Sequence, residues 1–324
     1  MEYPEPESFV GPDLLCRLPK PRRIVKRGHP EEDVITSELS RLAADEYSED
    51  FMCHMKQMEM KTLPDVSKID KQSEIKWCMR PYLIEFLVNA HAYMNLSTET
   101  LFLTVNLVDR YCSKREVYKV HYQLVGCAAL LIACKHGNKT YGTPKIGLLE
   151  KFCCNFYPRK FFIEMEMHLL DSIDWIIGYP TVNFFLQLMV AKNGDDQEVE
   201  HMATYLCEIA TYHREFISIK PSTMARLTLV LARVVLRRSE VDKADFDRVG
   251  SDSLSALSLC LHQPPTTLFN KYSGSELSEV SRKLDRIMSE QANRNAALGV
   301  AASYLEWKLG ADVAALEEIN IANN

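Results

Sequence analysis

The chain has 324 residues, of which 47% are hydrophobic and 25% are charged, and its formal net charge is −6. A negative net charge does not favour nucleic-acid binding, and no apolar run approaches the roughly 20 residues that cross a bilayer. Ten cysteines are scattered through the chain, mostly inside apolar helical patterns and without CxxC spacing. We therefore expect reduced thiols, no metal, no cofactor, no membrane and no nucleic-acid partner.

The N-terminal region is expected to be an extension rather than part of a core. Residues 1–33 are rich in proline and charge, which predicts disorder. Within them, KPRRIVKR at 20–27 is either a nuclear import signal or a solvated tail, and we expect the protein in nucleus and cytoplasm. Residues 34–60 carry apolar positions at helical spacing, and 62–74 break that pattern as a linker.

A series of five helices is predicted next. Ser97 begins a Ser-Thr-Glu-Thr helix start, and Pro144 is expected at the first position of the fourth helix. Short loops between the helices indicate one compact domain, which with the N-terminal helix spans 34–178. The predicted helices are 79–94, 97–112, 121–136, 143–155 and 157–177.

The same helical pattern then repeats with an offset of about 100 residues, at 179–193, 197–216 and 221–238. Two further helices, 264–274 and 275–291, come about 20 residues late, which predicts an insertion at about 239–263. The second domain therefore spans 179–292, and 293–324 form a C-terminal helix and tail. The fold class is all-α, with tandem five-helix domains.

Lys135 closes the most apolar predicted helix. Residues 124–134 carry no charge, and Gly137 follows the lysine closely enough to end the helix. A lysine there is either a cap that interacts favourably with the helix dipole or a contact for a partner at the rim of a rigid core. Trp175 and Phe102 are expected in the core.

A set of short motifs at fixed spacing resembles the cyclin box. The resemblance is strong over about 45–190 and rests on architecture alone over 190–292. Within the family it is most similar to fungal G1/S-type cyclins. The motifs are Met79-Arg80, Leu83, Val105-Asn106, Asp109-Arg110, Leu124-Val125-Gly126, Ala133-Cys134-Lys135, Met165-Glu166 and Pro180-Thr181-Val182-Asn183.

The resemblance implies a regulatory subunit that binds and activates a cyclin-dependent protein kinase catalytic subunit and helps to select its substrates at the G1 or G1/S stage. Lys135 and Glu166 match the family's kinase-binding pair, with donors for carbonyls and acceptors for N–H groups. Ile132, Leu170 and Ile177 would line an apolar groove for a kinase helix, and the helix at about 45–60 would also contact the kinase. Such a chain is not an enzyme and has no catalytic residue.

Two further roles follow from the resemblance. Arg80 and Asp109 correspond to an ion pair inside the first domain. A substrate or inhibitor docking peptide would bind a patch whose residues here are Met79, Leu83, Phe86 and Gln123. Phe86 stands where the family commonly has a tryptophan, and Asn89 where it has an acid, so the peptide preference is expected to be altered or lost.

Two other classes of function remain alternatives. Tandem domains of this kind also occur in cyclin-fold transcription factors or scaffolds that activate no kinase, and a salt-dependent DNA-binding assay would separate these from a kinase regulator. An enzyme that uses Cys153 or Cys154 as a nucleophile is the third possibility. No turn motif or second ligand pair accompanies these thiols.

Overall fold

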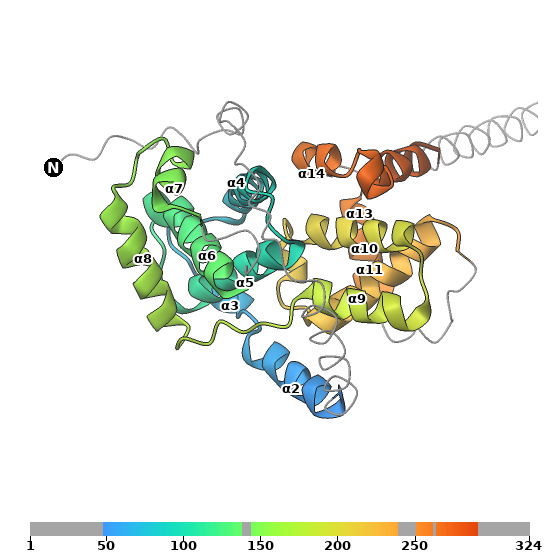
Figure 1. The fold of residues 1–324 in the computed structure, drawn as a ribbon, viewed down its shortest axis with the longest axis horizontal. Helices are drawn as coiled ribbons and strands as arrows, with labels where there is room; N and C mark the ends of the chain where they lie inside the picture. Colours follow the sequence, from blue (N-terminus) through green and yellow to red (C-terminus); the bar gives the residue numbers. More distant parts are fainter. Residues whose placement is uncertain (1–47, 138–143, 239–250, 262–263, 291–324) are drawn as a thin grey trace, which may run out of the picture.

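The structure is a computed structural model that describes residues 48–137, 144–238, 251–261 and 264–290. These residues form helices and no strand, in two helical domains that lie side by side (Figure 1). The all-α, tandem-domain prediction is therefore confirmed. The predicted disordered extension, the basic segment at 20–27 and the tail from 293 lie outside the described residues.

The first domain is built around one buried helix. Every residue of α5 from Thr100 to Ser113 is buried, and α3 (Val66–Ile69), α4, α6 and α8 pack around it. Ser97 caps the helix by accepting a hydrogen bond from the backbone N–H of Thr100, as the sequence predicts. The helices are α4 (Arg80–Tyr93), α5 (Thr98–Lys114), α6 (Tyr122–Gly137), α7 (Ile146–Phe152) and α8 (Arg159–Ser172), with short 3₁₀ turns η2 (Trp77–Met79) and η3 (Lys119–His121).

Two helix ends differ from the sequence prediction. Pro144 lies before Lys145, the residue at the N-cap of α7, and is not at the first helical position. Helix α8 ends at Ser172 rather than at 177, and Asp174 and Trp175 follow with φ of 57° and 58°. Because the chain turns there, Trp175 is 55% exposed and not in the core, whereas Phe102 is 5% exposed, as expected.

The second domain repeats the first with one added helix. Helices α9, α10 and α11 correspond to α4, α5 and α6, while α14 and the helical residues 280–290 take the places of α7 and α8. The predicted insertion contains the packed helix α13, whose Leu257 is fully buried against α10 and α11. The bounds are α9 (Val182–Asn193), α10 (Gln197–Ala210), α11 (Pro221–Val235), α13 (Ser251–Cys260) and α14 (Thr266–Lys271), with η4 (Arg214–Phe216) and η5 (Ser275–Leu277).

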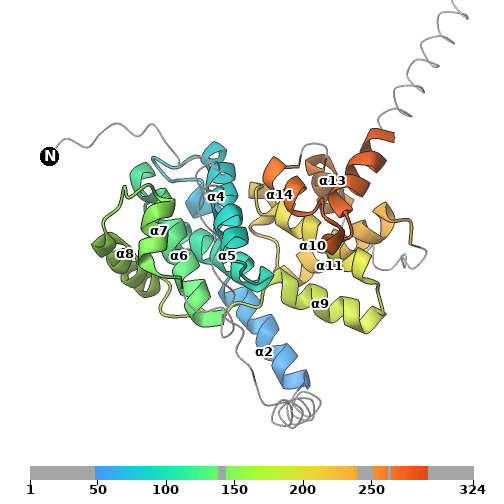
Figure 2. The same cartoon turned by 45° about the horizontal axis from the view of Figure 1, so that its top comes forward.

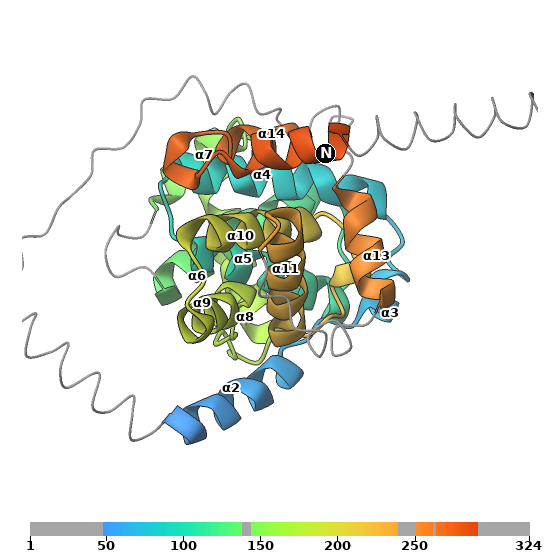
Figure 3. The same ribbon diagram turned by 90° about the vertical axis from the view of Figure 1, so that its right-hand side faces the viewer.

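The two domains are joined by polar contacts as well as by apolar packing. Glu99, in the first turn of α5, accepts hydrogen bonds from Thr181 and from Asn183 Nδ2, the latter at 2.9 Å. Figure 3 shows α14 of the second domain alongside α4 of the first, where the hydroxyl of Thr267 donates to Glu85 at 2.6 Å. The surface of α4 is therefore partly covered by the second domain.

The N-terminal helix α2 (Ser48–Lys61) projects from the body of the molecule (Figure 2). Glu59 anchors it, because its carboxylate accepts hydrogen bonds from the backbone N–H of Ser222 at 3.1 Å and from the Ser222 hydroxyl at 2.9 Å, at the start of α11. The Phe51 ring packs edge-on against Phe184 of α9, with ring centres 5.8 Å apart. The predicted linker at 62–74 contains one helical turn, α3 (Val66–Ile69).

Candidate functional site

Of the two thiols that the sequence raises as candidate nucleophiles, Cys154 is exposed, whereas Cys153 lies in a setting that is unfavourable for reaction. Cys153 is fully buried, and its Sγ lies 3.5 Å from Sγ of Cys127. The hydrogen bond between the two thiols and their burial raise the pKa of Cys127, which disfavours a thiolate at Cys127, the neighbour of Cys153. Among the described residues no group of three or more His, Cys, Asp or Glu side chains could hold a metal, and none of their helices is long and apolar enough to cross a membrane.

Lys135 and Glu166 contact each other at the surface between α6 and α8. The Nζ of Lys135 lies 2.5 Å from Oε1 of Glu166. The lysine side chain is 49% exposed, whereas the glutamate side chain is 11% exposed. Lys135 therefore presents unused N–H donors to solvent, and Glu166 provides a nearly buried carboxylate that fixes the lysine in place. The two predicted kinase-binding polar residues thus form one site.

The predicted apolar groove is only partly present. Ile132 is 2% exposed and Leu170 is 7% exposed, so both belong to the core rather than to an open surface. Ile177 is half-buried. The sequence could not show which face of α6 is free because every residue from Tyr122 to Cys134 is buried, and its apolar residues form no single stripe.

Other apolar side chains provide the open surface that the prediction missed. Ile163 and Met167 are 45% and 46% exposed and lie one turn apart on α8; at 3.6 residues per turn Ile163 is on the same side of the helix as Glu166, and Met167 is next to Ile163. Trp175 and Ile176, beyond the end of α8, are 55% and 36% exposed. The sequence did indicate this exposed apolar surface, because α8 carries apolar residues, among them Ile163 and Met167, outside its core-facing positions.

Trp175 is held in its exposed position. Its indole N–H donates to Oδ1 of Asp171 at 2.9 Å, one turn earlier on α8. Both Trp175 and the preceding Asp174 have positive φ, a conformation that is uncommon for residues other than glycine. A large aromatic side chain that is exposed and fixed by local contacts is a typical anchor for a protein partner.

The predicted docking patch is closed in this structure. Leu83, Phe86 and Gln123 are 0%, 5% and 7% exposed, and only Met79 is half-buried. They do not form an open groove because α6 packs against α4 on one side and α14 covers α4 on another. Gln123 is notable because its Nε2 is buried and has no hydrogen-bond partner among the described residues. Tyr82, on α4, is 60% exposed.

Arg80 and Asp109 lie together inside the first domain, as the resemblance implies. The Nη2 of Arg80 donates to Oδ2 of Asp109 at 2.9 Å, and its Nη1 donates to Oδ1. Both side chains are almost fully buried. This pair therefore belongs to the structural framework of the site and is not available to a partner.

Comparisons with known proteins agree with this architecture. Two family models match, "Cyclin, N-terminal domain" over residues 50–178 and "Cyclin, C-terminal domain" over residues 180–304. The G1/S-specific cyclin CCN1 of Candida albicans is 37% identical over 227 residues, which cover 63% of this chain and 33% of that protein. The G1/S-specific cyclin CLN2 of Candida albicans is 35% identical over 211 residues, which cover 61% of this chain and 45% of that protein.

The fold has a counterpart among solved structures. The X-ray structure of a viral cyclin from herpesvirus saimiri matches 73% of this chain and 96% of the viral chain, with a TM-score of 0.53 and 17% sequence identity. The match extends over both helical domains of the described chain. The region that this chain shares with the two Candida albicans proteins covers less than half the length of each of those proteins.

Proposed function

This chain belongs to the cyclin family, and on that premise we propose that it is a regulatory subunit that binds and activates a cyclin-dependent protein kinase and helps to select its substrates. The observation that carries the proposal is the Lys135–Glu166 pair with exposed apolar side chains beside it on α8. A rigid helical surface with a polar centre and an apolar margin suits a helix of a partner protein.

The polar pair gives the kinase a specific point of attachment. Lys135 can donate to backbone carbonyls of the partner while Glu166 accepts from backbone N–H groups, and the two already stand 2.5 Å apart. Trp175 and Met167 would supply most of the apolar contact, because they are exposed in the free chain and would be covered in the complex. Helix α2, with Phe51 and Met60 about half-exposed, provides a second surface for the same partner.

Activation would follow from binding alone. A protein kinase is active when the ion pair between its catalytic lysine and a helix glutamate is formed and its activation loop is ordered. A partner that binds this arrangement more tightly than the inactive one shifts the kinase towards it by the difference in binding free energy. In this proposal the chain catalyses no reaction itself, and its α6–α8 surface holds the kinase helix in the active position.

The stage, location and docking role are finer parts of the same proposal. Similarity to two G1/S-specific cyclins supports action at G1 or G1/S, and we infer a nuclear and cytoplasmic location from the basic segment at 20–27. A docking peptide would bind near Met79 and the exposed Tyr82, where Nε2 of Gln123, which has no partner among the residues that the structure describes, would donate to a peptide carbonyl. Since Phe86 is covered, peptide binding there would require local opening.

The test is capture of a kinase by the purified chain from cell extract, with the double variant Lys135→Ala/Glu166→Ala in parallel. We expect the wild-type chain to retain a cyclin-dependent kinase that phosphorylates added substrate, and the variant to lose both. Removing these contacts should cost about 2–5 kcal/mol of binding free energy. Equal helix content by circular dichroism shows that the variant is folded.

Two results would contradict the proposal. Retention of the same kinase by both proteins would place the interface away from α6 and α8. Retention of no kinase by the wild-type chain, together with salt-dependent DNA binding, would favour the cyclin-fold transcription factor instead. A matched control is Lys192→Ala on α9, an exposed lysine far from this site along the chain.

A further inference from the structure

Helix α8 has a second open side, opposite to the Lys135–Glu166 site. At 3.6 residues per turn, Phe161, Met165 and His168 lie on the side of the helix away from Glu166 and Leu170. There they form a hollow with Leu124 from the start of α6 and with His121 of η3, just before that helix, and Glu164 lies at its rim. Phe161 is 39% exposed, so this apolar hollow is open to solvent.

A second hollow lies where α5 ends. Its basic lining comes from two segments of the chain, with Lys68 and Lys71 from the region of α3 and Lys114 and Arg115 from the end of α5. Gln72 holds the two segments together, because its Nε2 donates to the carbonyls of Cys112 and Arg115 at 2.8 Å and 2.6 Å. The buried side chain of Gln72 therefore holds the two basic segments next to each other through its hydrogen bonds.

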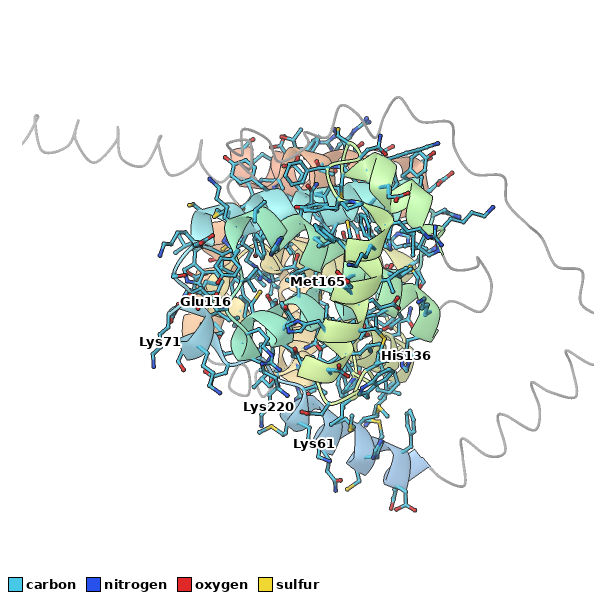
Figure 4. The ribbon with its side chains drawn as sticks, turned by 90° about the vertical axis from the view of Figure 1, so that its left-hand side faces the viewer. Lys61, Lys71, Glu116, His136, Met165 and Lys220 are labelled. Carbon is cyan, nitrogen blue, oxygen red and sulfur yellow. The ribbon has the colours of Figure 1, made fainter. Side chains whose placement is uncertain are left out.

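The apolar hollow and the basic hollow lie on one face of the molecule. Tyr111 of α5 shares a hydrogen bond of 2.8 Å with Nδ1 of His168, and one turn further on Nε of Arg115 donates to the hydroxyl of Ser172 at 3.0 Å. The end of α5 thus packs along α8 between the two hollows. Figure 4 shows this face, with Met165 of the apolar hollow near its middle and Lys71 of the basic hollow towards one edge.

The charges of the face favour an acidic ligand. Four basic side chains and one acidic side chain, Glu116, line the basic hollow. Lys71 makes no ion pair with any described residue, and within the described part of the chain the Arg115 side chain donates a single hydrogen bond, from Nε to Ser172. The pairs Lys68–Asp65 and Lys114–Asp174 are exposed, so both lysines can exchange partners at little cost.

The acid at the rim of the apolar hollow is already neutralised. Glu164 pairs with Lys160 on the same helix at 3.3 Å. We propose that this α5–α8 face binds a short acidic segment of a partner protein, with aspartate or glutamate side chains in the basic hollow and a large apolar side chain in the apolar hollow. The apolar hollow lies opposite Glu166 on α8, so a segment bound there leaves the Lys135–Glu166 pair uncovered.

The probe is a fluorescein-labelled synthetic peptide with a run of aspartates, a short Gly-Ser spacer and a Leu-Phe pair. Fluorescence anisotropy with the full chain should show saturable binding that weakens as salt is raised, because the contacts in the basic hollow are electrostatic. In one control peptide lysines replace the aspartates, and in a second control peptide alanines replace the Leu-Phe pair. Each should bind the wild-type chain at least about fivefold more weakly.

Two variants of the protein locate the binding. Lys71→Glu and Phe161→Ser should each weaken the acidic probe by about fivefold or more, since they alter the basic and the apolar hollow respectively. Lys192→Glu and Leu188→Ser on α9 are matched controls, with a similar change at exposed positions of the second domain, and should leave the affinity unchanged.

The proposal is overturned if the probe shows no saturable binding, if the alanine or lysine peptides bind as tightly, or if the α9 controls weaken binding as much as Lys71→Glu and Phe161→Ser. Circular dichroism of each variant shows that it is folded. The measurement uses the chain alone, so its outcome does not depend on whether the chain binds a kinase.

Discussion

Arg80 binds Asp109 with its two terminal nitrogens, and its Nε donates to the backbone carbonyl of Thr211 at 2.8 Å. The ion pair is internal to the first domain, but Thr211 belongs to the second, at the end of α10. One guanidinium therefore fixes α4 against α5 and also fixes the first domain against the second. The resemblance implied the first of these contacts and gave no indication of the second.

Arg80→Ala should destabilise the protein strongly. The substitution leaves the carboxylate of Asp109 buried without its partner, which costs about 3–5 kcal/mol. Urea unfolding followed by circular dichroism measures the loss. Lys160→Ala is the control, because its pair with Glu164 is exposed and should contribute less than about 1 kcal/mol. Equal unfolding midpoints for the two variants would contradict the structural role of Arg80.

Most helices of the two domains could be predicted from the sequence because they have strong local signals. Ser97 is a good N-cap residue, and the repeat of apolar positions gave the starts of α9, α10 and α11 to within a few residues. Helix α13 was read as part of an insertion because its packing depends on α10 and α11, which are distant in the sequence.

The open and closed surfaces could not be predicted in the same way. Phe86 is 5% exposed on α4, a helix that packs against α5 and α6 and is contacted by α14 of the second domain, and no local pattern encodes these long-range contacts. Trp175 was expected in the core because tryptophan is large and apolar, yet the two positive φ values after α8 turn it outwards. In both cases tertiary packing or backbone conformation decided the exposure, and side-chain polarity did not.

Trp175→Ala should reduce kinase binding without unfolding the chain. An exposed aromatic anchor commonly contributes about 2 kcal/mol or more to binding, which corresponds to roughly a 30-fold loss of affinity. The fold should change little, because Trp175 is 55% exposed and its hydrogen bond to Asp171 is at the surface. Surface plasmon resonance with the kinase captured in the pull-down measures the affinity.

Leu188→Ala on α9 is the matched control for Trp175→Ala. Leu188 is 42% exposed and lies in the second domain, away from the Lys135–Glu166 site. Its truncation removes exposed apolar surface of the same kind but should leave kinase affinity within about twofold. If both variants bind equally well, the interface does not include the end of α8.

Glu59→Ala should release helix α2 from the second domain. Glu59 is 4% exposed, and its loss leaves the backbone N–H and the hydroxyl of Ser222 without their acceptor, at a cost of about 1–3 kcal/mol. Faster tryptic cleavage after Lys56 or Lys61, followed by mass spectrometry, reports the release. Glu49→Ala, at the exposed start of the same helix, should leave the cleavage rate unchanged; equal acceleration by both variants would rule out a specific anchor.

His91 should make the fold less stable in mild acid. Its Nε2 carries the proton, since it lies 2.8 Å from the carbonyl of Ser97, which can only accept; Nδ1 is buried and has no partner among the described residues. Burial, followed by the nearby charge of Lys271, lowers the pKa of His91 from its ordinary value of 6.5 to about 4, although Glu208 acts in the opposite direction. The folded chain therefore keeps His91 neutral where the unfolded chain takes up a proton.

The sign of the effect follows from that difference in pKa. Stability due to neutral His91 is fully present above about pH 6.5 and is lost progressively as the pH falls towards 4, by about 3 kcal/mol in total. His91→Gln keeps a donor for Ser97 but has no titrating group, so its unfolding free energy should fall less over this range. Urea unfolding from pH 7 to 4.5 compares the two proteins. Parallel pH profiles would show that His91 takes up its proton as readily in the folded chain as in the unfolded one.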